Sequence, residues 1–212
     1  MLQQFKKRKK TIAILAVILI FLIIIIFFLK NNDKNLKIGN TKSNKSIEDI
    51  EEYILNLSSY EATVAVTVVS NKNENKYVLS QKYVAPNISK QIVLEPENIA
   101  GLETTYDGNN LTIYNAKFNL SKIYESYESF TNNDLSLEAF IADYRQNKED
   151  NNNKCYEENN EFVLECTSKK GSDYRQNKKL YVKKETGNPC KMVIQDVNEK
   201  NVVYILYNEI TI

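Results

Sequence analysis

The chain has 212 residues and a formal net charge of +1, from 28 Lys and Arg against 27 Asp and Glu, and it contains no His and no Trp. Without His, no Ser-His or Cys-His nucleophile can form, and the most common general base and metal ligand near neutral pH is missing. The three cysteines are spaced by 11 and 24 positions, which matches no zinc pattern. We therefore expect no enzyme activity, no metal site and no cofactor.

An apolar run without any charge, Thr11–Leu29, follows five consecutive cations at Lys6–Lys10. A helix of 19 residues is about 28 Å long, close to the thickness of the hydrocarbon core of a bilayer. A short buried core helix is the alternative, but no polar face interrupts the run. The preceding cations keep the N-terminus in the cytoplasm by the positive-inside rule.

The flanks of this run predict an anchor that stays in place. Large apolar residues continue up to Lys30, whereas a signal peptidase needs small residues at its cleavage site, and a lipoprotein signal needs a nearby cysteine. We predict four parts: a cytoplasmic basic tail (1–10), a transmembrane signal anchor (11–29), a flexible Asn- and Lys-rich linker (30–45) and one extracytoplasmic domain (46–212) at the cell membrane.

The charge outside the anchor argues against a nucleic-acid partner. Six of the 28 cations lie in residues 1–30, which hold no acid, so 22 cations remain against 27 acids in the rest of the chain. Phosphate backbones are bound mainly by clustered Lys and Arg, which this mildly acidic balance does not favour.

The domain begins with a predicted helix and a meander. Ser46 and Asp49 form a capping-box pattern before apolar residues at helical spacing. Alternating apolar residues then predict three antiparallel strands, separated by turn residues. The helical apolar residues are Ile47, Ile50, Tyr53, Ile54 and Leu57, and the strands are Glu61–Ser70, Lys76–Val84 and Ile88–Leu94.

The middle of the chain predicts a hairpin and a second helix. Asp107–Asn110 is a turn between two short apolar stretches. Tyr124, Tyr127 and Phe130 recur at three-residue steps, which indicates an irregular or helical segment. Asp134 or Ser136 then caps a clear helix, whose apolar face holds Leu137, Phe140, Ile141 and Tyr144.

In the last third of the chain, the residue pattern predicts strands only. The final strand is apolar on both faces, so we expect it to be central or covered on both sides. The predicted strands are Cys155–Glu158, Glu161–Thr167, Lys178–Lys184, Cys190–Val197 and Val202–Ile212.

Two cysteines flank the first of these hairpins. A loop centred between Asn160 and Glu161 would place Cys155 opposite Cys166, and an oxidising exterior would allow a disulfide between them. A register change of one residue would move them to opposite faces, so this pairing stays open. Cys190 is left over, and we expect it to be a small buried apolar residue.

Four stretches carry a resemblance to a known family. They are IEDIEEYILNLSSYEATVAVTV, KYVLSQKYVAPNISKQIVLEP, TYDGNNLTIYN followed by LSKIYE, and KKLYVKKETGNPCKMVIQDVNEKNVVYILYNEI. Residues 46–212 resemble the LolA-like fold, and within it the clostridial proteins similar to the germination lipoprotein GerS. The resemblance implies an α+β fold in which a curved antiparallel sheet, a half-barrel, packs on a few helices.

The resemblance implies two functions. LolA carries lipoproteins in an apolar cavity, whereas GerS-like proteins bind and activate a cortex-modifying amidase in spore germination. Ala85 stands where the LolA pattern has an arginine, and a fixed anchor prevents shuttling. We therefore expect a membrane-anchored, non-catalytic protein that binds and regulates a cell-wall or spore-cortex enzyme, such as an amidase, in sporulation or germination.

The alternative is a carrier module that binds a lipid, a lipoprotein or another acyl ligand. Inward-facing apolar residues would line its cavity, although the same residues also fit an ordinary core. They are Val64, Val66, Leu79, Ile92, Ile113 and Phe140. A cell-wall hydrolase is a third reading, since glycosidase chemistry needs only two carboxylates.

Overall fold

The computed structural model describes residues 46–127, 133–148, 153–168 and 177–212. The predicted anchor at Thr11–Leu29 lies outside these residues. Among the residues that are described, no helix is both long and apolar enough to span a bilayer. The described residues belong to one compact unit.

The first helix, α2 (Ile47–Leu55), begins as the capping box predicts. The backbone N–H of Asp49 donates to the Ser46 hydroxyl at 3.2 Å, and the Asp49 carboxylate accepts from the backbone N–H of Ser46 at 3.1 Å. Both donors would otherwise lack a partner at the helix end. The apolar face of α2 is buried through Ile50 and Ile54, which are fully inaccessible to solvent.

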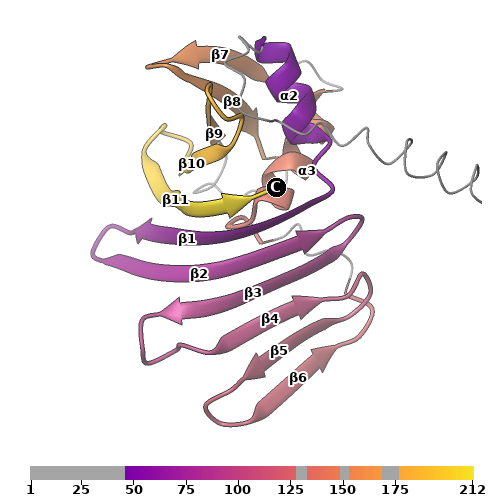
Figure 1. Ribbon diagram of the computed structural model, residues 1–212. Coiled ribbons are helices and arrows are strands. Elements are labelled where there is room, and N and C mark those ends of the chain that lie inside the picture. Colours follow the sequence, from indigo (N-terminus) through magenta and orange to yellow (C-terminus); the bar gives the residue numbers. More distant parts are fainter. Residues whose placement is uncertain (1–45, 128–132, 149–152, 169–176) are drawn as a thin grey trace, which may run out of the picture. The chain divides into compact units, whose positions relative to one another are not determined.

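Eleven strands form one open, curved sheet in which every neighbour is antiparallel (Figure 1). The order is β6-β5-β4-β3-β2-β1-β11-β10-β9-β8-β7. Its strands are β1 (Ser59–Val69), β2 (Glu74–Val84), β3 (Ile88–Glu95), β4 (Leu102–Tyr106), β5 (Leu111–Asn115), β6 (Leu120–Tyr124), β7 (Lys154–Glu158), β8 (Glu161–Thr167), β9 (Asn177–Lys183), β10 (Pro189–Gln195) and β11 (Asn201–Thr211).

The sheet consists of two meanders joined in the middle by β1 and β11, where Val66 pairs with Ile205. The predicted central position of the last strand is confirmed. Its second apolar face, however, is not covered: Ile205 is fully buried, whereas Leu206 and Tyr204 are 48% and 36% exposed. Within the part of the chain that the structure describes, the helices cover one face of the sheet, and the apolar residues on the other face of β11 meet solvent.

The second helix, α3 (Leu137–Lys148), is capped by Ser136, whose hydroxyl accepts from the backbone N–H of Ala139 at 3.3 Å. The predicted buried face is confirmed, because Leu137, Phe140, Ile141 and Tyr144 are all 5% exposed or less. Both helices lie beside the half of the sheet formed by the later strands (Figure 1): α2 contacts β7 and β8, and α3 contacts β8.

The outer strands β4, β5 and β6 extend beyond these two helices (Figure 1). The strand β6 was missed, because the spacing of Tyr124 and Tyr127 indicated an irregular or helical segment. The structure pairs Leu120 with Asn115 and Tyr124 with Leu111, so Leu120–Tyr124 is an edge strand, and Tyr127 lies beyond its end in irregular structure. Phe130, the third member of the pattern, lies outside the described residues.

The β7–β8 hairpin turns at Asn159 and Asn160, which adopt φ of 49° and 66°, a conformation that asparagine tolerates better than most residues. This turn places Cys155 opposite Leu164. The predicted opposition of Cys155 and Cys166 is therefore wrong by two residues, although both still lie on one face. All three cysteines, Cys190 included, are free thiols.

Candidate functional site

The structure places four of the six cavity candidates inside the main core. Val64, Val66, Leu79 and Phe140 are at most 3% exposed and belong to one continuous cluster of buried side chains. They are ordinary core residues that contact one another and the helices. Their side chains pack against other core side chains.

The other two candidates lie elsewhere. On β3 the buried apolar residue is Val93, which pairs with Leu79, while Ile92 pairs with Ser80 on the opposite face of the sheet. Ile113 lies on β5 in the outer part of the sheet, where it is only partly buried. The six residues are therefore not brought together around one cavity.

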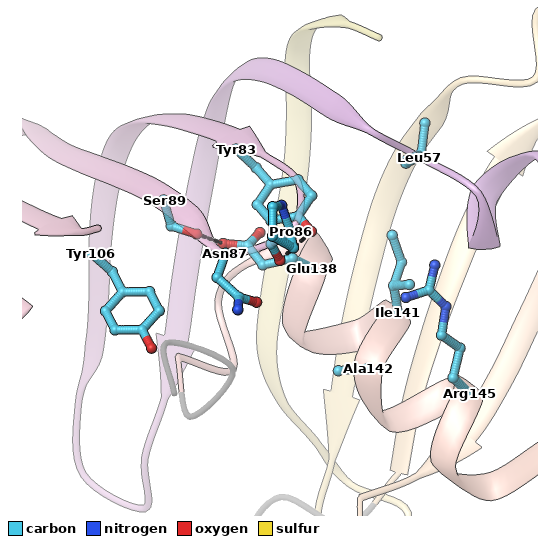
Figure 2. Close-up of a pocket in the computed structure, with 10 residues that line it drawn as sticks. All are labelled: Leu57, Tyr83, Pro86, Asn87, Ser89, Tyr106, Glu138, Ile141, Ala142 and Arg145. Carbon is cyan, nitrogen blue, oxygen red and sulfur yellow. Dashed lines mark hydrogen bonds between the residues drawn. The ribbon is translucent and has the colours of Figure 1, made fainter. Parts of the chain in front are cut away.

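A cleft opens instead between the β2–β3 turn and α3, with a volume of about 120 Å³ (Figure 2). One wall comes from Tyr83, Pro86 and Asn87, which end β2 and form the turn. The other wall comes from α3, which contributes Glu138, Ile141, Ala142 and Arg145. Leu57, Ser89 and Tyr106 complete the lining.

Glu138 is the buried acidic group of this cleft, at 8% exposure. The hydroxyl of Tyr60 donates to its Oε2, and the hydroxyl of Ser89 donates to its Oε1 at 2.9 Å. Burial raises the pKa of Glu138, and the hydrogen bonds from Tyr60 and Ser89 work in the opposite direction. The carboxyl group also lies in the first turn of α3, where the helix dipole favours a negative charge.

Two tyrosines surround this carboxyl group from the sheet side. The Tyr60 hydroxyl, while donating to Glu138, accepts the backbone N–H of Leu137 at 3.3 Å. Burial and then the charge of Glu138 raise the pKa of Tyr60 and of Tyr207, so both rings stay neutral. The buried hydroxyl of Tyr207 finds no hydrogen-bond partner in the described part of the chain.

Arg145 lies at the other end of the cleft, two helical turns after Glu138. Its side chain is exposed, and its guanidinium donates to the backbone carbonyl of Leu55 at the end of α2. Within the described residues, no salt bridge involves either Glu138 or Arg145. The cleft therefore carries an acid and a base that are not paired with each other.

A second feature is the free edge of the sheet at β6. Among the described strands, β6 pairs with β5 alone, and its apolar residues are strongly exposed. Leu120 is 66% exposed, Ile123 is 59% exposed, and Phe118 in the turn before the strand is 65% exposed. A strand edge that combines unpaired backbone groups with apolar side chains is a template for pairing with another chain.

Sequence reasoning missed Glu138, Arg145 and the β6 edge. Acids in the first turn of a helix are common, and the burial of Glu138 depends on Tyr60 and Ser89, which are 78 and 49 residues away along the chain. No sequence signal reveals such a contact. Within the described ranges, no three His, Cys, Asp or Glu side chains gather in a way that would hold a metal ion.

Solved structures resemble this fold. A chain in the structure of the CwlD amidase from Clostridioides difficile in complex with the GerS lipoprotein is 25% identical, with a TM-score of 0.50, over 80% of this chain and 98% of that one. An uncharacterised conserved protein from Thermus thermophilus is 14% identical over 78% and 84% of the two chains, with a TM-score of 0.49. A LolA superfamily protein from Nitrosomonas europaea is 14% identical over 79% and 94%, with a TM-score of 0.40.

The open antiparallel sheet with the described helices on one face is shared with the matched chain of the CwlD–GerS complex, and this LolA-like, GerS-like fold is the one that the resemblance predicted. A family model described as sporulation protein YdcC-like matches residues 9–211. The chain belongs to the sporulation protein YdcC-like family. A search of curated proteins finds no match.

Proposed function

We propose that this chain binds a cell-wall amidase-like enzyme and regulates it during sporulation or germination, without catalysing a reaction itself. The observation that carries the proposal is the exposed apolar edge at β6. Phe118, Leu120 and Ile123 are each more than half exposed, and burying such side chains against a partner is favourable by about 25 cal/mol per Å².

The edge offers two kinds of contact at once. The unpaired side of β6 supplies backbone donors and acceptors that an extended segment of the enzyme can pair with. Leu120 and Ile123 are an odd number of residues apart, so they lie on opposite faces of the strand, where each contacts the partner from its own side. Backbone pairing supplies affinity, and the two side chains supply register.

The comparison with GerS supports this choice of partner. The matched structure is a complex of GerS with the CwlD amidase, and the match spans 98% of that chain at 25% identity. The family name connects this chain with sporulation. An amidase-like enzyme on the outer face of the membrane is therefore the partner that we propose.

The location is part of the same proposal. We propose that Thr11–Leu29 spans the cell membrane once, with the N-terminus in the cytoplasm. The linker at 30–45 would then hold the domain close to the outer surface, where an enzyme that acts on the cell wall is present.

The alternative function, carriage of a lipid or acyl chain, is less well supported. Ligand pockets of drug-sized molecules are about 300 to 1,000 Å³, whereas the cleft beside α3 is about 120 Å³. Val64, Val66, Leu79 and Phe140 are packed into the core. The geometry therefore favours contact through the protein surface.

The experiment uses the full chain and an amidase-like enzyme isolated from the same cells. The double variant Leu120→Lys/Ile123→Lys places charges on the edge, a device that natural proteins use to block strand pairing. We expect at least a tenfold loss of affinity by calorimetry and a matching loss of the effect on amidase activity. The control is Leu206→Lys, since Leu206 is 48% exposed on the interior strand β11.

Equal affinity of the edge variant and the unchanged chain would contradict the use of β6. A native mass spectrum that shows a stoichiometric lipid and no protein partner would instead support the carrier function.

A further inference from the structure

We propose that the cleft between α3 and the β2–β3 turn binds a small α-amino acid, with the ammonium group of the ligand against Glu138 and its carboxylate against Arg145. This inference concerns a different surface from the β6 edge and does not depend on the proposed function.

Glu138 is a buried acid without a cationic partner. Its side chain is buried and borders the cleft, and no cation among the described residues pairs with it. A buried carboxylate without a counter-ion is unfavourable, and a cation delivered by a ligand removes that penalty. The hydroxyls of Tyr60 and Ser89 hold one carboxylate oxygen each. The carboxyl group also takes hydrogen bonds from the Ser136 side chain and from its own backbone N–H, but none of these donors carries a charge, and an ammonium group would be the first charged partner of Glu138 among the described residues.

Arg145 has hydrogen-bond donors left for a ligand. One of its N–H groups is used by the carbonyl of Leu55, whereas a guanidinium has five donors in a planar fork that suits a carboxylate. Figure 2 shows Arg145 on the same helix as Glu138, with Ile141 and Ala142 on the turn between them. The cleft is therefore negative at one end and positive at the other.

The spacing of the two charges sets the length of the ligand. Glu138 and Arg145 are seven residues apart, which places them on one side of α3 at about 10 Å along its axis. An α-amino acid with a hydrogen bond of about 3 Å at each end spans a similar length. A single amine or a single carboxylate would satisfy only one end.

The volume sets the size of the ligand. An apolar cavity of about 150 Å³ holds benzene, a molecule of about six non-hydrogen atoms. The cleft of about 120 Å³ therefore suits glycine or alanine rather than a larger amino acid. The walls from Tyr83, Pro86 and Ile141 offer apolar contact to a short side chain.

The competing explanation is a purely structural one. In that case Glu138 only connects β1 and β3 to α3 through Tyr60 and Ser89. The charge of Arg145 would then bind no ligand in the cleft. The two explanations differ in what happens when a zwitterion is added, and in whether Arg145 matters for the response.

The test is an NMR titration of the full chain with ¹³C-labelled isoleucine and alanine methyl groups. Ile141 and Ala142 line the cleft and report on it, while Ile54 in the core is the internal reference. The probes are L-alanine, D-alanine and glycine, with ethylamine and propionate as matched compounds that carry one charge each. We expect saturable shifts at Ile141 and Ala142 with at least one amino acid, and at least tenfold weaker binding of both single-charge compounds.

Two variants assign the charges. We expect Glu138→Gln and Arg145→Gln each to weaken binding at least tenfold, whereas Lys148→Gln, an exposed cation on the same helix, leaves it unchanged. If Glu138→Gln disturbs the Ile54 signal, the exposed Arg145 carries the test, since its replacement leaves the core intact.

Shifts that stay linear up to 50 mM ligand, equal shifts with ethylamine or propionate, or unchanged binding in Arg145→Gln would each overturn the proposal. The β6 variants Leu120→Lys/Ile123→Lys should titrate like the unchanged chain. Failure of the amino-acid site therefore leaves the proposed enzyme contact untouched, and the reverse also holds.

Discussion

The ammonium nitrogen of Lys178 lies 2.6 Å from Oδ2 of Asp143 on α3, and the Lys178 side chain is completely buried. A second carboxylate, that of Asp134, lies 2.9 Å away. Burial lowers the pKa of Lys178, but the two carboxylates raise it by more, so the net shift is upward and the group stays charged. This cluster ties β9 to α3 and to the segment before it.

Replacing Lys178 by Met should lower the free energy of unfolding by about 3 kcal/mol, since removing one partner of a buried ion pair leaves the other charges uncompensated. Urea unfolding followed by circular dichroism measures this change. Lys179→Met is the matched control: its ammonium is 3.6 Å from Glu165 and its side chain is 24% exposed, so we expect less than 1 kcal/mol. Equal effects of the two variants would contradict the structural role of Lys178.

The two faces of β11 should respond differently to truncation. Ile205 is fully buried, so Ile205→Ala should cost about 2 to 5 kcal/mol through lost burial and a residual cavity. Leu206 is 48% exposed, so Leu206→Ala should change stability by less than about 0.5 kcal/mol. Comparable losses would mean that a further element covers the second face of the sheet.

The stability of the chain should depend on pH through Glu138. Its folded-state pKa is raised by burial, so the stability that its protonated form supplies is complete below its ordinary pKa of about 4.3 and is lost as the pH rises through the folded-state value. Glu138→Gln removes this titration. We expect the stability of the variant relative to the unchanged chain to increase as the pH is raised from about 4.

Unfolding free energies at a series of pH values give this difference directly. The tyrosines around Glu138 do not titrate in this acidic range, because burial raises the pKa of Tyr60, Tyr83 and Tyr207 above its ordinary value. A difference that is constant with pH, or that falls as the pH rises, would refute the upward shift.

The three thiols should be unreactive in the folded chain. Burial raises the pKa of Cys155 to about 11, and that of Cys166 and Cys190 to about 12, so little thiolate exists at pH 8. We expect slow alkylation of the native chain and three alkylated cysteines after unfolding without reductant, counted by mass spectrometry. A count of one, with the label on Cys190, would instead establish the Cys155–Cys166 disulfide.

The sequence predicted those strands whose two faces meet different environments. In β1 the alternation of Val64 and Val66 with more polar neighbours indicates burial on one face. The predicted strand, Glu61–Ser70, agrees with Ser59–Val69 to within two residues at its start and one at its end. Edge strand β6 is exposed at every residue, so its sequence carries no alternation, and only the pairing with β5 defines it.

The prediction of which side chains of β3 face inward was wrong for a related reason. Its inward positions include Ser89, which donates to Glu138, and Gln91, which accepts from Gln81 at 3.2 Å, while the apolar Ile88 and Ile92 face outward. Hydrophobic alternation therefore pointed to the wrong face. The polar groups of the cleft invert the pattern locally, and their partners lie too far along the chain for spacing rules to find.

The pairing of β1 with β11 also bears on how fast the domain forms. Within each meander, neighbouring strands are close in sequence and can zip together as hairpins. The contact between Val66 and Ile205, in contrast, closes a loop of nearly the whole domain, and such distant pairings form slowly because the entropy of loop closure must be overcome first. Until that step, β1 presents a bare apolar edge, and a chain interrupted before β11 would keep that edge open to aggregation.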